Sequence, residues 1–144
     1  MIRFAAAAAL LLTAAPAGAF SLDQTGPADS RVVLTFETGA RTGAVMIALY
    51  ASEAGYEGGP AVARAAIPAS GPVVARFGNL PAGDYAVKAF HDLDGDGAMD
   101  TNPFGLPTEP YAFSNNAVGN MGPARWDRAH FAVSGETAQT ISLR

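Results

Sequence analysis

Apolar and polar side chains alternate along several short stretches of this chain, a pattern typical of half-buried β-strands. In the first stretch, Val32, Leu34 and Phe36 share one face and the residues between them lie on the other. The stretches are short and separated by glycine-containing turns, so no helix is expected. The expected strands are residues 32–37, 44–50, 61–67, 73–77, 84–91, 129–133 and 137–143, with 61–67 as an edge strand that exposes Arg64.

Seven short strands with regular turn signals predict an all-β fold, a single antiparallel Ig-like β-sandwich. One long loop precedes the last two strands, because no regular period is sustained from residue 92 to residue 128. A connection of this length inside a compact domain is usually functional. We expect its aromatic side chains to plug the open end of the sandwich, with a binding surface as the alternative; they are Phe104, Tyr111, Phe113 and Trp126.

The start of the chain has the features of a secretory signal peptide. Arg3 supplies a positive charge, an apolar run covers residues 4–15, and Ala17-Gly18-Ala19 is an A-x-A cleavage site. The run is shorter than the about 20 residues of a transmembrane helix, so we expect cleavage rather than an anchor. The expected organisation is a signal peptide at 1–19, a short leader at 20–30 and a β-sandwich domain at 31–144, in the periplasm or outside the cell.

Composition and charge exclude several classes of protein. The 144 residues include no cysteine, so disulfides, thiolate zinc sites and cysteine nucleophiles are absent. Thirteen acidic residues against nine basic ones give a net charge of −4, and the sequence contains no basic cluster. Nucleic acid and anionic membrane surfaces are therefore poor partners. No stable membrane insertion is expected once the signal peptide is removed.

The most distinctive stretch is acidic and follows directly after the fifth expected strand. Asp92, Asp94 and Asp96 occupy positions one, three and five of the spacing found in EF-hand calcium loops. Gly97 stands at position six, where that loop turns sharply, Ala98 at position seven offers a carbonyl, and Asp100 is at position nine. Calcium prefers six to eight hard oxygen ligands, and these residues supply them. We therefore predict a calcium site.

The similarity to the EF-hand loop stops before its last ligand. Position twelve, a bidentate glutamate in the EF-hand, is Pro103 here, and no flanking helices are expected. Glu109 is the candidate for the missing ligand, with Asn102 as another. The alternative is a solvated turn without metal, because Asp and Gly are common turn residues. Magnesium fits less well, because it binds few protein carboxylates and retains its own waters.

Catalytic residues are harder to identify. His91 lies beside Asp92 at the inward-facing end of a strand, where a histidine is more often a hydrogen-bonded core residue than a catalyst. His130 is the only other histidine, and the two would bind zinc only if their strands placed them together. Ser114 lacks the G-x-S-x-G context of a serine nucleophile.

Two segments resemble known families. The stretch FGNLPAGDY, residues 77–85, resembles the F-x-x-L-P-x-G-x-Y turn of transthyretin-like, carboxypeptidase-regulatory-type β-sandwiches. His91-Asp92 with the Asp/Gly run, then GLPTE at 105–109 and YAFSNNA at 111–117, resemble the uncharacterised exported bacterial family called domain of unknown function 2141. The resemblance implies an exported β-sandwich and carries no activity or catalytic residue.

Three functions are compatible with these features. The first is an exported, non-enzymatic module that is stabilised by calcium and binds a protein or a glycan at the cell envelope. The second is a metal-assisted hydrolase that uses His91, Asp92 and Glu109 around an open metal position. The third is a structural envelope component without metal. The absence of a nucleophile and base pair favours the first.

Overall fold

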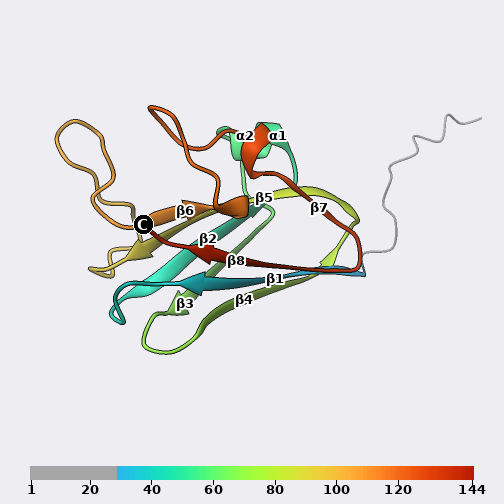
Figure 1. The fold of residues 1–144 in the computed structure, drawn as a ribbon, viewed down its shortest axis with the longest axis horizontal. Coiled ribbons are helices and arrows are strands. Elements are labelled where there is room, and N and C mark those ends of the chain that lie inside the picture. The colour runs from blue at the N-terminus through green and yellow to red at the C-terminus, as the bar shows by residue number, and fades with distance from the viewer. Residues whose placement is uncertain (1–28) are drawn as a thin grey trace, which may run out of the picture.

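A computed structural model describes residues 29–144, which form two β-sheets packed face to face (Figure 1). One sheet has the order β4-β1-β8 and the other the order β3-β2-β5-β6, with β7 paired to β5. The predicted all-β sandwich is confirmed. The strands are β1 (Ser30–Glu37), β2 (Ala44–Tyr50), β3 (Ala63–Pro68), β4 (Val73–Leu80), β5 (Gly83–Asp92), β6 (Tyr111–Phe113), β7 (Phe131–Val133) and β8 (Glu136–Ser142).

The described residues do not test the predicted signal peptide or most of the predicted leader. The predicted signal peptide at 1–19 and most of the leader lie outside residues 29–144. Ser30, assigned to the leader, belongs to β1 and is buried. Within the described part of the chain, no helix has the length and apolar character that a bilayer span requires.

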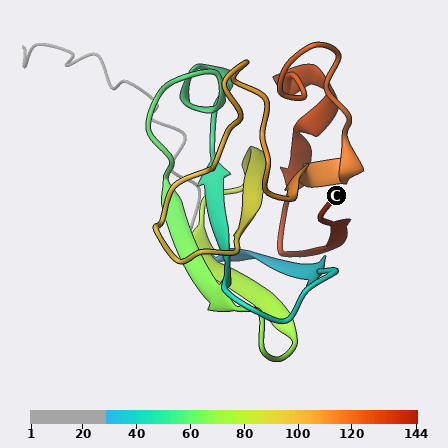
Figure 2. The same cartoon turned by 90° about the vertical axis from the view of Figure 1, so that its left-hand side faces the viewer.

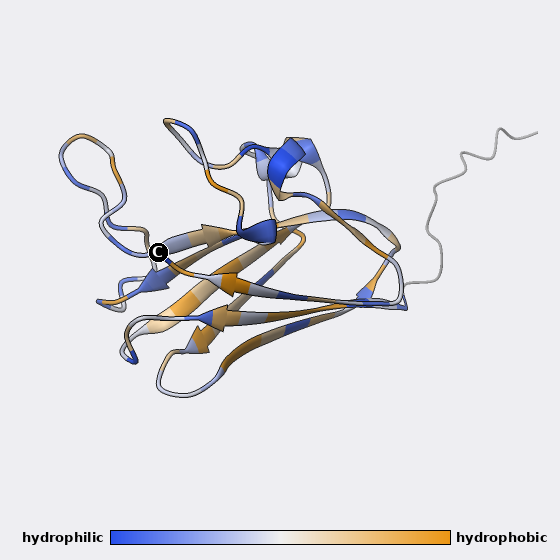
Figure 3. Ribbon diagram, viewed as in Figure 1, coloured by the Kyte–Doolittle hydropathy of each residue, from blue (hydrophilic) through white to orange (hydrophobic). Residues whose placement is uncertain are grey.

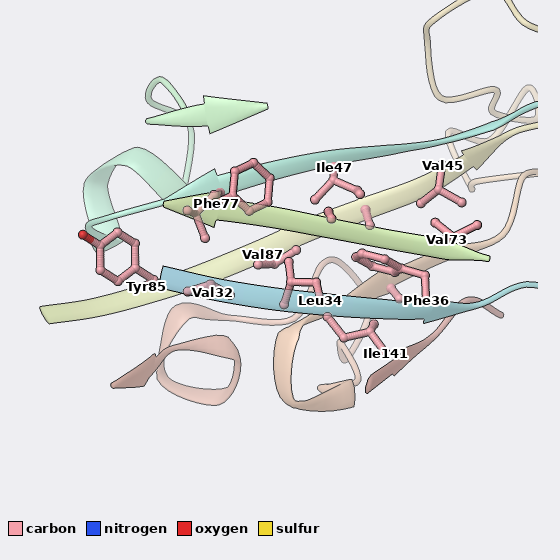
Figure 4. Packing of buried hydrophobic residues seen from close by; sticks show 14 of the residues in the cluster. Val32, Leu34, Phe36, Val45, Ile47, Val73, Phe77, Tyr85, Val87 and Ile141 are labelled. Carbon is pink, nitrogen blue, oxygen red and sulfur yellow. The ribbon is translucent and has the colours of Figure 1, made fainter. Parts of the chain in front are cut away.

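The core lies between the sheets and is built by the alternation seen in the sequence. Val32 and Leu34 of β1 point inward toward Val87 of β5, as Figure 4 shows. The inward side chains of β2 are Val45 and Ile47, together with Leu49. Apolar colour follows the strands of both sheets, whereas the short helices are hydrophilic (Figure 3). Alternation with a period of two thus determines which face of each strand is buried.

Three single-turn helices within residues 29–144 correct the expectation that the chain has none. They are α1 (Glu53–Tyr56), the 3₁₀ turn η1 (Ser114–Asn116) and α2 (Trp126–Ala129). In α1 the Ser52 hydroxyl accepts a hydrogen bond from the N–H of Gly55 at 3.1 Å, which caps the turn. A single turn is too short to produce a periodic pattern, so α1 was expected as part of a loop at 52–60, and η1 and most of α2 as part of the long loop at 92–128.

The strand count and one strand direction also differ from the prediction. There are eight described strands rather than seven, because the three-residue β6 lies within the segment expected to be one long loop. β1 and β8 run parallel, with Arg31 opposite Glu136, whereas the other pairings are antiparallel. Hydrophobic alternation specifies which face of a strand is buried but carries no information on strand direction.

The motif at residues 77–85 forms a tight turn between β4 and β5. Asn79 adopts a left-handed conformation with φ of 55°, and the β1–β4 register shifts between Ser30 and Val32. The Tyr85 hydroxyl donates to the carbonyl of Pro81 at 2.7 Å. The tyrosine therefore closes the turn on its own strand, which explains why this residue type follows the Leu-Pro pair.

Residues 111–116 join the two sheets along one side of the sandwich. The N–H of Tyr111 donates to the carbonyl of Arg144 at 3.0 Å, while β6 pairs with β5. The Asn116 side chain donates to the carbonyl of Thr140 at 3.0 Å and accepts from the N–H of Ser142 at 2.9 Å. The Asn116 side chain thus bonds the backbone of β8 as a neighbouring strand would, and it covers this edge of the sheet.

Candidate binding groove and acidic loop

Most outward-facing side chains of the sheet β3-β2-β5-β6 are apolar, like the inward-facing ones; Arg64 and Lys88 are cationic exceptions on this face. The outward residues of β2 are Met46, Ala48 and Tyr50, and Ala86 and Phe90 of β5 point the same way. A strand that is apolar on both faces is covered on both sides in folded proteins. The sequence signal for this second apolar face was the nearly unbroken apolar run of residues 44–50.

Half of this outward face is covered by a second, smaller core. Tyr50, Ala86 and Phe113 pack there against Tyr56 of α1 and Ala129 of α2. The Tyr56 ring lies edge-on to Tyr50 at 5.6 Å between centroids, and its hydroxyl donates to the carbonyl of Ala124 at 2.7 Å. Burial raises the pKa of Tyr56, so the hydroxyl stays protonated and keeps this hydrogen bond.

The other half of the face is open and forms a groove of about 1140 Å³. Two loops rise on the side of this sheet away from β1, β4 and β8 (Figures 1 and 2), and residues of both loops line the groove. We call residues 93–109 the first arm and residues 117–125 the second arm. Phe104 of the first arm is 89% exposed, and Met121 of the second arm is fully exposed. Both line the groove, so large apolar side chains stand in solvent at its mouth.

The predicted plugging of the sandwich end by aromatic residues is therefore wrong. Phe104, Tyr111 and Phe113 line the groove, and Trp126 packs against the small core beside Tyr56. All four lie on the outward side of one sheet rather than between the two sheets. The alternative expectation, a binding surface, describes the first three residues better.

The tip of the first arm is a hairpin with an exposed apolar end. Thr101 and Pro107 form a bridge, and the Asn102 side-chain oxygen accepts from the N–H groups of Phe104 and Leu106 at 2.9 and 3.0 Å. The oxygen of Asn102 is thus used to hold the turn, which makes this residue a poor metal ligand. The turn presents Phe104 and Leu106 to solvent beside the groove.

The predicted acidic residues lie at the base of the same arm and come together as two overlapping groups. Carboxylate oxygens of Asp92, Asp94 and Asp96 lie within 4.8 Å of one another, and so do those of Asp94, Asp100 and Glu109. Asp94 belongs to both groups. All five acidic residues singled out in the sequence are therefore collected at one place, including Glu109, which follows Asp100 by nine positions in the chain.

Backbone hydrogen bonds fix this arrangement. Glu109, only 6% exposed, accepts from the N–H of Leu93 at 2.8 Å and from that of Asp100 at 3.1 Å. Asp92, 3% exposed, accepts from the N–H groups of Gly95 and Gly97 at 2.8 and 2.9 Å. Glu109 thus joins the two ends of the loop, and Asp92 turns the chain between them.

The carboxyl groups of the loop have opposite pKa shifts. Burial alone would raise the pKa of Asp92, but the N–H groups of Gly97 and Gly95 stabilise its anion and lower the pKa overall. The N–H of Asp96 lowers the pKa of Asp94, yet burial and the neighbouring carboxyls of Asp92 and Asp100 raise it to about 6. Ionised Asp94 is thus disfavoured by its surroundings, as expected of negative charge gathered without a counterion.

The donor set fits calcium chemically. Each carboxylate presents about four lone-pair positions, so the oxygens that accept backbone N–H bonds keep capacity for a cation. Five carboxylates provide hard oxygens, which calcium prefers over nitrogen and sulfur. The N–H of Ala98 donates to the Asp96 carboxylate at 2.9 Å. The carbonyl of Ala98 stays a predicted ligand. These are the residues that would hold the ion, and a bound calcium would neutralise the charge of the loop.

The two histidines lie away from both carboxylate groups. His91 is completely buried on the core side of β5, and its Nε2 donates to the carbonyl of Thr42 at 2.6 Å. Asp92, the next residue along the strand, projects from the opposite face. His130 stacks on Trp126 and lies across from the start of β5, about 17 Å along the strand from His91. A zinc pair therefore does not form between them.

Ser114 has a structural environment. Its hydroxyl is completely buried, accepts from the N–H of Val87 at 2.8 Å and donates to the carbonyl of Ala129 at 2.5 Å. Both of its hydrogen-bonding capacities are used by the backbone, and it has no access to the groove. The side chain joins β5, η1 and α2 rather than acting as a nucleophile.

The chain belongs to an uncharacterised bacterial family. The model of the family described as "Uncharacterized protein conserved in bacteria (DUF2141)" matches residues 37–142, which include β2 to β8, both arms and the acidic loop but only the last residue of β1. The resemblance noted in the sequence is thereby confirmed. No curated protein and no solved structure matches the chain.

Proposed function

We propose that the protein is an exported, non-enzymatic binding module whose ligand occupies the apolar groove and whose first arm is ordered by calcium. The groove supports binding most directly. Ligand sites are typically concave and lined mainly by apolar and aromatic side chains with a few polar groups. The groove at about 1140 Å³ is large enough for such a ligand, and it is bounded by two arms with apolar tips.

Binding is better supported than catalysis. The hydrolase alternative needs His91, Asp92 and Glu109 around an open metal position, but His91 lies on the core side of β5. Ser114 is fully committed to the backbone. A structural envelope component without metal would not need an apolar groove open to solvent, because exposing such a surface is unfavourable unless something covers it.

Calcium connects to the groove through the first arm. Gly97 and Met99, which lie within the acidic loop (residues 92–100), line the groove. A cation held by the carboxylates would restrict these residues and the hairpin that carries Phe104. Calcium is thus expected to act on ligand affinity by ordering one wall of the site.

The groove is tested with N-phenyl-1-naphthylamine, a neutral apolar dye that fluoresces when it leaves water. We expect saturable binding to the purified protein. Met46→Lys places a charge on the apolar floor and should weaken binding at least about tenfold. Thr35→Lys is the matched control, because Thr35 is an exposed outward residue in the central strand of the other sheet. Equal dye binding by both variants would contradict the assignment of the groove.

The calcium part is tested by thermal unfolding. Calcium at 100 times its Kd should stabilise the chelator-treated protein by about 2.7 kcal/mol, which is about 10 °C in Tm for a domain of this size. Asp94→Asn should abolish most of the shift, whereas Asp127→Asn, an exposed aspartate on α2, should retain it. If millimolar calcium does not change Tm, the calcium proposal is wrong, whereas the groove proposal is unaffected.

A further inference from the structure

Two cationic side chains share one row across the floor of the groove. Ala48 of β2 is paired with Arg64 of β3 on one side and with Lys88 of β5 on the other. Residues paired across a sheet point to the same face, so all three project outward. Adjacent strands are about 4.8 Å apart, which places the two cationic residues about 10 Å apart with only a methyl group between them. All three residues line the groove.

Neither cation is neutralised by the described part of the chain. The ion pairs among residues 29–144 involve Arg31, Arg125 and His130, and Glu57 acts on Lys88 only at longer range. The Lys88 ammonium lies 4.3 Å from the centroid of the Tyr56 ring and donates to the Tyr56 carbonyl. A half-buried cation in this position is stabilised by an anion that reaches it.

The next row toward the acidic loop is apolar across the whole sheet. Met46 of β2 is paired with Ala66 and with Phe90, and Phe90 is paired with Tyr111. Met99, Phe104 and Leu106 of the first arm also line the groove. Beyond this row, Ala44 is paired with Asp92, where the acidic loop begins. Along the strands the floor therefore changes from cationic to apolar to acidic.

We propose that the ligand is a long-chain fatty carboxylate, with its head group above Ala48 between Arg64 and Lys88 and its chain over Met46 and Phe90. This inference rests on the proposed function and specifies the ligand of the same groove. The charge pattern fixes the orientation, because Arg64 and Lys88 lie at one end of the apolar row and residues 93–109 at the other end supply no cationic side chain. The apolar row and the tip of the first arm cover the chain.

The same pattern disfavours other ligand classes. A glycan would bury hydroxyl groups against methionine and phenylalanine side chains, where few hydrogen-bond partners are available. A neutral amphiphile would gain the apolar contacts but leave both cations unpaired. The expectation of a protein or glycan partner made from the sequence stays a prediction, and the groove lining favours an amphipathic anion.

The test is displacement of N-phenyl-1-naphthylamine from the purified protein by dodecanoate, dodecanol or dodecyltrimethylammonium, each below its aggregation concentration. We expect dodecanoate to compete at least about tenfold better than dodecanol, the effect of one charge-assisted hydrogen bond. Arg64→Gln should remove most of that preference and leave dodecanol unchanged. Arg64→Glu should favour the trimethylammonium compound. Arg76→Gln, an exposed arginine on β4 of the other sheet, should behave as the unmodified protein.

The outcomes separate this inference from the proposed function. Failure of the dye to bind would overturn both. Dye binding with equal displacement by dodecanoate and dodecanol, or an Arg64→Gln variant with unaltered preference, would overturn the fatty carboxylate and leave an apolar binding module. A dimer in size-exclusion chromatography that Met46→Lys dissociates would show that a second copy occupies the groove and would also overturn the inference.

Discussion

Replacing Ser114 by alanine should destabilise the protein severely, because two backbone groups would lose their partner. The N–H of Val87 donates to the hydroxyl at 2.8 Å, and the hydroxyl donates to the carbonyl of Ala129 at 2.5 Å. Ser114 is completely buried, so water does not replace the hydroxyl easily. Each unsatisfied buried group costs about 1–3 kcal/mol, giving a loss of about 3 kcal/mol. Domains have only about 5–15 kcal/mol in total.

Urea unfolding measures this loss. With a slope of about 1.5 kcal/mol per molar, a domain of this size should unfold at about 2 M lower urea in Ser114→Ala. Ser142→Ala is the matched control, because its hydroxyl donates to the exposed Glu37 carboxylate and its loss should cost less than about 1 kcal/mol. A Ser114→Ala midpoint within about 0.3 M of the unmodified protein, with the same slope, would refute the structural role of the hydroxyl.

Three further predictions follow from the acidic loop and the β4–β5 turn. In chelator near pH 7.5, Asp94→Asn should raise Tm by removing a disfavoured charge, whereas in calcium it should lower Tm relative to the unmodified protein; the same sign under both conditions would contradict the site. The pKa of Asp94 is raised to about 6, so protonation of Asp94 stabilises the folded protein, and this stabilisation is lost as pH rises from about 4 to about 6. Calcium must displace that proton to bind. The calcium-induced Tm shift should therefore be small at pH 5 and complete above pH 7. Tyr85→Phe should cost about 0.5–1.5 kcal/mol in urea unfolding through loss of the bond to Pro81, and a neutral result would show that the turn closes without it.

The fold was predictable wherever one face of a strand is buried and the other is not. Val32, Leu34 and Phe36 alternate with polar residues, and the structure buries all three. The 3₁₀ turn and β6 escaped prediction because three residues are too few to show a period. The parallel pairing of β1 with β8 was equally hidden, because alternation does not depend on the direction of the neighbouring strand.

The sequence alone predicted the acidic loop but not the groove. The acidic loop was found because its spacing is local, and Glu109 followed from asking which nearby carboxylate could complete it. The groove was missed because its floor combines Arg64, Ala48 and Lys88 from three strands. These residues become neighbours only through pairing register, which the sequence does not state. Only the apolar outward positions of residues 44–50 gave a local hint.

The position of β8 has a consequence for how the protein is made. β1 obtains one of its two neighbours from residues 136–142, about a hundred positions later in the chain. During synthesis from the N-terminus, the three-stranded sheet stays incomplete until that late segment has emerged. A nascent chain that cannot finish folding early stays unfolded for longer, and an unfolded chain is suited to the export that we propose. Contacts between such distant residues also slow the final collapse, so folding is expected to follow passage across the membrane rather than precede it.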